Sequence, residues 1–289
     1  MENSNCRVFD VLETIGSLPT LPVVISRLNA LIGNPHTNMQ EISEVIAKDQ
    51  AISVRVIRLV NSAFYGFPNS IGSIRQAIVI LGLNTVRNII LGVSVVKVFE
   101  NGSAPSVFDR HKFWLHTFAV AMGAKLLAQK LGRPEPEDYF ISGLLHDIGI
   151  LVLDQFFHRE FIDIIQNSLK DNTEYESAEI NKLGVMHAEI GAFLAGKWKI
   201  PEFLINTIQY HHNPMEGGSQ TDKNRNFIAI THLSDITARK RMFGAFVGHQ
   251  KYVYNGEALR LTGANEQMLD EVFDRVEKEV SGLIKEWNL

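Results

Sequence analysis

The amino-acid sequence predicts an all-α protein, and three observations support this fold class. Apolar residues recur at helical spacing through most of the chain, as in Val24, Leu28 and Leu31. Capping residues stand before several of these segments, and Gly or Pro follows them. The last segment, 266–287, carries a sustained apolar stripe with a charged opposite face. Together these patterns predict a multi-helix bundle.

In the first hundred residues the pattern predicts five helices. Asp49 is placed to cap one of them, and Ser73 followed by Gln76 forms a capping-box pattern before another. Several β-branched runs also fit strands by propensity, but the caps and the spacing favour helices. The expected segments are 23–32, 37–46, 49–60, 73–81 and 84–96.

The stretch Asn-Gly-Ser-Ala-Pro-Ser at 101–106 is the best candidate for a boundary between two parts of the chain. After it, apolar stripes predict a second series of helices. One of them, from Tyr139 to Phe156, is apolar enough to be a single buried helix. The expected segments are 113–131, 139–156, 161–169, 175–183, 187–198, 201–211, 227–242 and 266–287.

Composition indicates a soluble, cytoplasmic, globular protein. The 289 residues are 45% hydrophobic and 21% charged, with a net charge of −4, so no general nucleic-acid-binding surface is expected. Cys6 is the single cysteine, which excludes an intrachain disulfide. The N-terminus lacks the pattern of a signal peptide, and the most apolar segment, 89–96, is far shorter than the roughly 20 residues of a membrane span.

An adjacent His146 and Asp147 lie inside the apolar segment 139–156. Burying an ionised carboxylate is costly unless it is paired or binds a cation. Two explanations remain open from these residues alone: a hydrogen-bonded pair that joins two core helices, or a metal site.

Other histidines and carboxylates occupy similar positions, in or at the end of mostly apolar helices. Imidazole and carboxylate ligands suit first-row transition metals such as Fe, Mn, Ni, Co or Zn. Five histidines and two carboxylates exceed what one ion requires, so two ions are expected if the groups converge, with Asp147 placed to bridge them. His232 lies one helical turn before Asp235, and either could be the ligand. The candidate metal ligands are His116, His146, Asp147, His187, His211, His212 and Asp235.

This ordered set resembles the HD superfamily of metal-dependent phosphohydrolases, and most closely its binuclear HD-GYP type. The N-terminal half makes the resemblance more specific. Leu18-Pro19-Thr20-Leu21-Pro22, the stretch from Asp49 through Asn61-Ser62-Ala63-Phe64-Tyr65, and Ser73-Ile74 to Ile80-Leu81-Gly82 are similar to the HDOD family, a bacterial signalling module.

The resemblance implies an N-terminal helical subdomain (18–100) packed on an HD-type metal-binding subdomain (107–242), together forming an HDOD domain over 18–242. Residues 1–17 would be an N-terminal extension, and residues 243–289 a C-terminal loop with an amphipathic helix. Position by position, the seven candidates match the ligands of the binuclear HD type.

Two departures from HD-GYP enzymes bear on activity. Ile150 stands where catalytic members have a lysine that grips substrate phosphate, and the segment after His211-His212 lacks their Gly-Tyr-Pro motif. An apolar side chain cannot neutralise phosphate charge. Lys112 occupies the position of an extra acidic ligand in some HD-GYP sites, which argues against a third metal.

The sequence therefore favours a non-enzymatic signalling module that binds metal, acts with a protein partner and takes a small phosphorylated ligand. The alternative is an active phosphodiesterase or phosphatase, in which Asp147 and a metal-bound water would be the catalytic groups. A helix-turn-helix reading of 39–60 is weaker, because Lys48, Arg55 and Arg58 are balanced there by three acidic residues. No membrane association is expected.

Overall fold

The computed structural model describes residues 8–13, 20–32, 39–62, 64–100, 108–216, 222–244 and 252–287. These residues form helices and short connections, and none of them belongs to a β-strand. The predicted all-α fold class is therefore confirmed.

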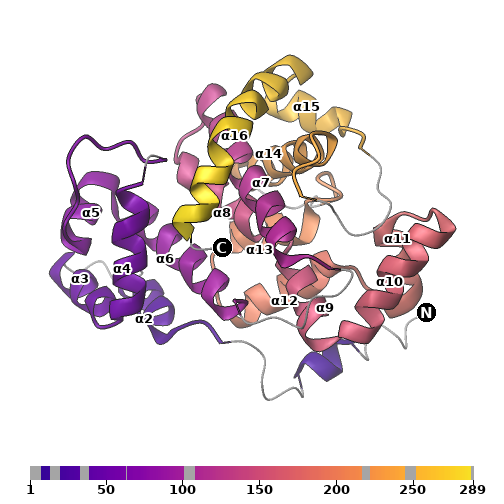
Figure 1. The fold of residues 1–289 in the computed structure, drawn as a ribbon, viewed down its shortest axis with the longest axis horizontal. Coiled ribbons are helices and arrows are strands. Elements are labelled where there is room, and N and C mark those ends of the chain that lie inside the picture. Colours follow the sequence, from indigo (N-terminus) through magenta and orange to yellow (C-terminus); the bar gives the residue numbers. More distant parts are fainter. Residues whose placement is uncertain are drawn as a thin grey trace.

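The N-terminal helices gather at one end of the molecule (Figure 1). The Asp49 side chain accepts a hydrogen bond from the backbone nitrogen of Ile52 at 3.1 Å, and the Ser73 hydroxyl accepts one from Gln76 at 3.2 Å. Both predicted caps are thus formed. The start of the expected segment 37–46 lies outside the described residues. This group comprises α2 (Val23–Ile32), α3 (Met39–Ala47), α4 (Gln50–Val60), α5 (Ile74–Leu81) and α6 (Leu83–Val98).

The remaining helices form the larger part of the fold, with α10 and α11 at the end opposite the N-terminal group (Figure 1). One short helix, α15 (Gly256–Thr262), was not expected from the sequence. The others are α7 (Arg110–Lys130), α8 (Pro136–Leu145), α9 (Ile148–Phe156), α10 (His158–Asp171), α11 (Tyr175–Leu183), α12 (His187–Lys197), α13 (Glu202–Tyr210), α14 (Asp222–Lys240) and α16 (Glu266–Trp287).

The expected single helix from Tyr139 to Phe156 is wrong in one respect. The helix breaks at His146 and Asp147, which separate α8 from α9. Asp147 has φ −102° and ψ 16°, so it leaves the regular helical conformation. The apolar pattern continues across the break, which is why periodicity alone did not reveal it.

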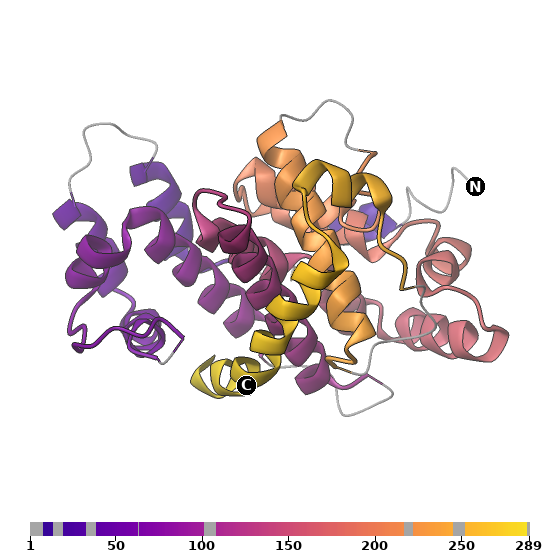
Figure 2. The same ribbon diagram turned by 90° about the horizontal axis from the view of Figure 1, so that it is seen from above.

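Helix α7 lies at the centre and packs against α8, α14 and α16. The long C-terminal helix α16 crosses α7 and reaches the N-terminal group (Figure 2). Its last residue, Trp287, packs edge-on against Phe118 at a ring-centroid distance of 4.9 Å. A Cβ at Gly92 of α6 would come within 2.9 Å of the Trp287 ring, so the small residue admits the indole. The C-terminal helix α16 thus contacts both the N-terminal group of helices and the central helix α7.

A second junction joins the N-terminal group to α7 and α8. The Lys125 ammonium lies 4.1 Å from the centre of the Phe64 ring and 4.9 Å from that of Tyr65. The same ammonium pairs with Glu137 at 2.5 Å. The charge of this almost fully buried lysine is therefore balanced by the carboxylate and further stabilised by two aromatic faces. The subdomain limits 18–100 and 107–242 stay a prediction, and the expected boundary at 101–106 lies outside the described residues.

Residues 8–13 form a further helical segment, which packs far along the chain against α12. The rings of Phe9 and Phe193 lie 5.2 Å apart, and Lys197 pairs with Glu13 at 3.3 Å.

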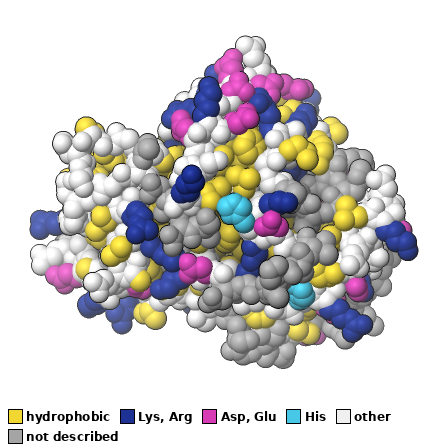
Figure 3. Space-filling model, in the orientation of Figure 1, with side chains coloured by type: hydrophobic (Ala, Val, Ile, Leu, Met, Phe, Trp, Pro, Cys, Tyr) yellow, Lys and Arg dark blue, Asp and Glu magenta, His cyan; other side chains and the backbone are white. Residues whose placement is uncertain are grey.

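One stretch, Pro136–Phe156, has the length and apolarity to cross a membrane, but 89% of its most apolar window is buried in the fold. That burial is typical of core helices such as α8 and α9. On the face shown in Figure 3, acidic and basic side chains are interspersed.

Candidate metal centre

Five structural elements bring the seven candidate residues together in the interior. His116 comes from the middle of α7, and His146 and Asp147 form the break between α8 and α9. His187 is the first residue of α12. His211 and His212 follow the end of α13, and Asp235 lies in α14. The side chains of all but His212 are at most 1% exposed, and that of His212 is 13% exposed.

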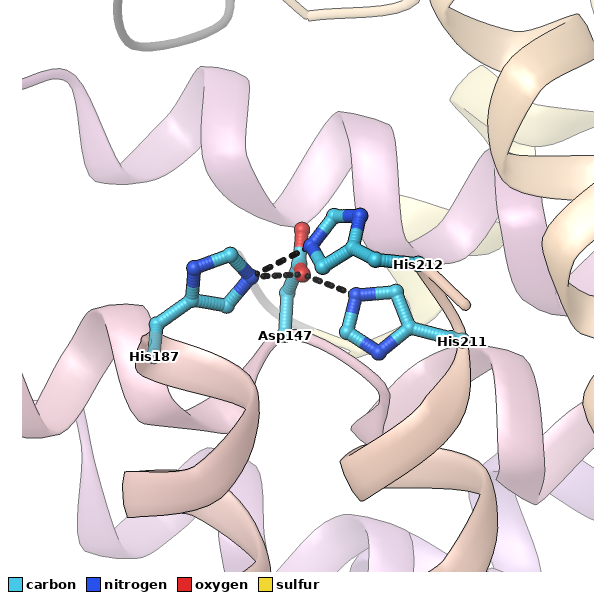
Figure 4. Close-up of side chains that lie close together, drawn as sticks. All are labelled: Asp147, His187, His211 and His212. Atoms are coloured by element: carbon cyan, nitrogen blue, oxygen red, sulfur yellow. Dashed lines mark hydrogen bonds and ion pairs between the residues drawn. The ribbon is translucent and has the colours of Figure 1, made fainter. Parts of the chain in front are cut away.

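Asp147 lies at the centre of this cluster, and its two carboxylate oxygens face different histidines. Its Oδ1 lies 3.2 Å from the Nε2 atoms of both His187 and His211. Its Oδ2 lies 3.1 Å from the Nε2 of His146 and 3.8 Å from that of His116. Figure 4 shows Asp147 pointing between His187 and His211. The carboxylate therefore divides the cluster into two halves.

His212 belongs to the half around Asp147 Oδ1, and Asp235 belongs to the other half. The Nε2 atoms of His212 and His187 are 2.9 Å apart (Figure 4). Asp235 Oδ1 lies 3.0 Å from the Nε2 of His116 and 3.8 Å from that of His146. In each half, the potential ligand atoms lie within 4.8 Å of one another: Asp147, His187, His211 and His212 in one, and His116, His146 and Asp147 in the other. A third group within the same distance, His146, His211 and Asp235, connects the two halves.

The rings that face Asp147 are oriented by contacts at their other nitrogens. Nδ1 of His146 lies 2.7 Å from the carbonyl oxygen of Gly143, and Nδ1 of His211 lies 2.8 Å from that of Ile208. Carbonyl oxygens accept hydrogen bonds, so Nδ1 carries a proton, and in the neutral ring Nε2 has a lone pair available to a metal ion. His116 makes the same contact with the carbonyl oxygen of Phe243 at 3.3 Å. This arrangement is typical of metal-ligating histidines.

His187 is oriented by a carboxylate instead. Glu179 Oε2 lies 2.7 Å from the His187 Nδ1 and also accepts a hydrogen bond from the His187 backbone nitrogen at 3.1 Å. Glu179 is fully buried on α11. A carboxylate behind a histidine fixes its tautomer and makes the ligating nitrogen more basic.

Small residues allow the helices to approach closely enough for these contacts. A Cβ at Gly149, two residues after Asp147, would overlap the carbonyl oxygen of His187. A Cβ at Gly143 would lie 2.7 Å from the Cα of Ala121 on α7. Glycine at these two positions therefore sets the distance from the α8–α9 break to α12 and α7.

The donor atoms fit a bound cation. Among the described residues, the Nε2 atoms of His146 and His211, both oxygens of Asp147 and Oδ2 of Asp235 are buried without a hydrogen-bond partner outside the cluster. A buried polar atom without a partner costs about 1–3 kcal/mol. Several such atoms directed at one another are expected where a metal ion would complete their interactions. Imidazole and carboxylate donors match Fe, Mn, Ni, Co and Zn.

The cluster also perturbs the pKa values of its members. Burial alone would lower the pKa of His187, but the carboxylates of Glu179 and Asp147 raise it to about 10. Burial lowers the pKa of His211 to about 4, against the opposing effect of Asp147. Burial would raise the pKa of Asp147, yet His146, His187 and His211 hold it well below its usual range. In the metal-free protein, Asp147 is thus an anion.

The structure separates Asp235 from His232, which the sequence left as alternatives. Nδ1 of His232 lies 2.7 Å from the carbonyl oxygen of His211, and its Nε2 accepts a hydrogen bond from the Asn255 backbone at 3.3 Å. Both ring nitrogens are therefore engaged away from the cluster, and Asp235 is the residue that faces it. His232 instead holds the backbone that carries His211.

Three charged residues near the cluster were missed in the sequence: Glu176, Glu179 and Arg239. Arg239 lies four residues after Asp235, and its Nε donates to Asp235 Oδ1 at 2.7 Å. Residues four positions apart in a helix lie on the same face, so this ion pair could have been predicted from the sequence. Glu176 and Glu179 lie three residues apart in a helix with an ordinary pattern, and nothing in that spacing pointed to the cluster. Ile150 is fully buried, as an apolar residue at this position should be.

Comparison with known proteins bears on the family and the fold of the chain. A family model described as the HDOD domain matches residues 18–214. An uncharacterized protein of Treponema pallidum (strain Nichols) is 29% identical over 204 residues, which are 70% of this chain and 39% of that protein. The chain spans less than half of the length of the curated relatives that it matches.

Two solved structures share the fold over nearly the full chain. One is an HDOD domain protein of unknown function from Geobacter sulfurreducens, which is 26% identical, has a TM-score of 0.77, and covers 98% of this chain and 96% of its own. The other is a candidate phosphohydrolase from Shewanella amazonensis SB2B, also 26% identical, with a TM-score of 0.71 and coverages of 96% and 97%.

Proposed function

The chain belongs to the HDOD family, and from this premise we propose that it is a signal-transduction module whose buried His–Asp cluster binds two transition-metal ions. It would act by binding a small phosphorylated ligand and a protein partner. Membership of the family supports the proposed signalling role, and the buried His–Asp cluster supports the proposed metal binding.

One observation carries the proposal of two ions. The Oδ1 of Asp147 faces His187 and His211, while its Oδ2 faces His146 and His116. A carboxylate with one oxygen in each of two donor groups is suited to bridge a pair of cations. His212 would complete one half and Asp235 the other. A hydrogen-bonded His–Asp pair in the core would need one imidazole, whereas four surround this carboxylate.

The side chains around the cluster would hold the ligands in place. Glu179 fixes the ring of His187, and backbone carbonyls fix those of His146 and His211. Two bound transition-metal ions would supply Lewis acidity toward a phosphoryl group. Ile150 offers no charge to such a group, which favours binding and signalling over turnover.

A second function, metal-dependent phosphohydrolysis, has two observations in its favour. All seven ligand candidates are retained, and a purely structural site would not need them all. The solved relative from Shewanella amazonensis SB2B is itself named as a candidate phosphohydrolase. If the chain is an enzyme, Asp147 is the protein group placed closest to the reaction.

Elemental analysis and an activity screen test both functions. Protein purified without added metal should contain about two transition-metal ions per chain. Less than about half an ion would contradict the metal site. Manganese- or iron-loaded protein should then show no turnover of bis(p-nitrophenyl) phosphate or of p-nitrophenyl phosphate. Turnover that is lost in His146→Ala would establish the enzymatic alternative instead.

A further inference from the structure

Glu176 on α11 makes two contacts at the outer edge of the cluster. Its Oε1 lies 3.6 Å from the His212 Nδ1 and 3.5 Å from an Nη1 of Arg239. These three side chains come from α11, from the segment after α13 and from α14. Their exposed fractions are 21% for Glu176, 13% for His212 and 2% for Arg239. Glu176 is therefore the most accessible of the three.

Both contacts of Glu176 are long for charge-assisted hydrogen bonds, which are usually about 2.7–2.9 Å. Glu179, one turn later on the same helix, lies 2.7 Å from its own histidine and is fully buried. The two carboxylates of α11 thus differ in kind. Glu179 is fixed, whereas Glu176 is loosely held at a partly exposed position where another anion could replace it.

Arg239 supplies the positive charge at this position. Its Nε donates to Asp235 at 2.7 Å, which leaves its Nη1 side directed at Glu176. A guanidinium keeps its proton even when buried and binds carboxylate and phosphate with the same planar geometry. Ile150 provides no such charge. Arg239 lies beside the cluster and supplies a positive charge that could bind a phosphate group in its place.

We propose that His212 and Arg239 form a binding site for the phosphate group of a small ligand, and that Glu176 occupies this site until the ligand displaces it. This inference rests on the proposed function, because the ligand would bind at the edge of the metal centre. Displacement of Glu176 would break the contacts of α11 with His212 and with α14, while the contact of Glu179 with His187 would remain. Ligand binding would thereby change how the α11 end of the fold is held.

Inorganic phosphate is a suitable probe. Wild-type protein, Glu176→Gln and the control Glu202→Gln, an exposed glutamate on α13, are loaded with Mn²⁺ and checked for metal content. Each is then titrated with phosphate by calorimetry at pH 7. Removing the competing charge should strengthen phosphate binding by about fivefold or more in Glu176→Gln. Glu202→Gln should match the wild type.

A second variant tests Arg239. Adding Arg239→Lys to Glu176→Gln should abolish the gain in affinity, because lysine cannot replace the planar guanidinium. Equal phosphate affinity in the wild type and Glu176→Gln, or no binding to either, would overturn the inference even if both carry two ions. Less than about half an ion in the wild type would instead contradict the metal centre itself. The two failures are therefore distinguishable.

Discussion

Gly149 and His187 are in backbone contact: a Cβ at position 149 would overlap the carbonyl oxygen of His187 and lie 2.9 Å from the nitrogen of Gly191. This contact sets α9 against the start of α12. Because Asp147 precedes Gly149 by two residues, the same contact positions its carboxylate beside the His187 ring. Gly191 is the second glycine of this junction, and a Cβ there would in turn come close to the backbone of Gly149.

Gly149→Ala should therefore destabilise the protein, by about 3 kcal/mol or more, because the atoms in the way are backbone and cannot rotate aside. The free energy of unfolding from urea denaturation measures this. Gly196→Ala, in α12 itself, is the matched control, since nothing lies within 4 Å of its Cβ position. It should be neutral or slightly stabilising. Equal stability of the two variants would contradict the packing argument.

Glu179→Gln should weaken metal binding by about 10- to 100-fold, the usual effect of losing the carboxylate behind a ligating histidine. The amide keeps the size of the side chain but lacks the charge that favours the Nδ1 proton of His187. The Mn²⁺ dissociation constant, from competition with a chelator, measures this. Glu202→Gln controls for the loss of one negative charge. An unchanged affinity would show that Glu179 only supports the fold.

Much of the fold could be predicted from the sequence, because helical spacing and caps are local signals. Asp49 and Ser73 cap helices as expected. The break between α8 and α9 could not be predicted, because His146 and Asp147 interrupt the helix without interrupting its apolar pattern. Tertiary contacts of the two polar side chains accompany that break, and such contacts leave no periodic trace.

Part of the cluster could be predicted from the sequence for a similar reason. Polar residues in apolar helices stood out, and the structure brings all seven together. The choice between His232 and Asp235 depended on which side chain faces the cluster, and the contacts of His232 with His211 and with Asn255 decide that. Glu176 and Glu179 sit in a helix of ordinary composition, so only their contacts with His212 and His187 reveal them.

Metal affinity should increase with pH, because His187 is protonated in the metal-free protein. Its folded pKa of about 10 exceeds the usual value of 6.5. Below pH 10 the metal must displace this proton, so affinity should gain up to about tenfold per pH unit for one proton released. Calorimetry in buffers of different ionisation enthalpy would count the protons. A value near zero at pH 7 would contradict the protonated state of His187.

The same shift has the opposite effect on the stability of the metal-free fold. A pKa raised in the folded state contributes stability that is fully present below pH 6.5 and is lost as pH rises through about 10. Metal-free protein should thus lose stability between pH 7 and pH 10 relative to the metal-loaded form. Thermal unfolding of both forms across this range would measure the difference. Parallel curves would contradict the assignment.

Asp147→Ala should reduce the metal content from about two ions per chain to less than about half an ion. This single carboxylate contributes an oxygen to each half of the cluster, so its loss should affect both halves together. Elemental analysis of the purified variant measures this. Asp163→Ala, which removes a partly exposed carboxylate of α10 that pairs with Lys182 of α11, should keep both ions.

Asp235→Ala separates a bridging role for Asp147 from a general loss of negative charge. The imidazoles nearest to Asp235 Oδ1 are those of His116 and His146, at 3.0 and 3.8 Å, so its removal should release one ion and leave the half formed by His187, His211 and His212 occupied. About one ion per chain in Asp235→Ala, beside almost none in Asp147→Ala, is the expected pair of results. If each substitution removes a single ion, Asp147 belongs to one half only. The division of its two oxygens between four imidazoles would then have no counterpart in metal binding.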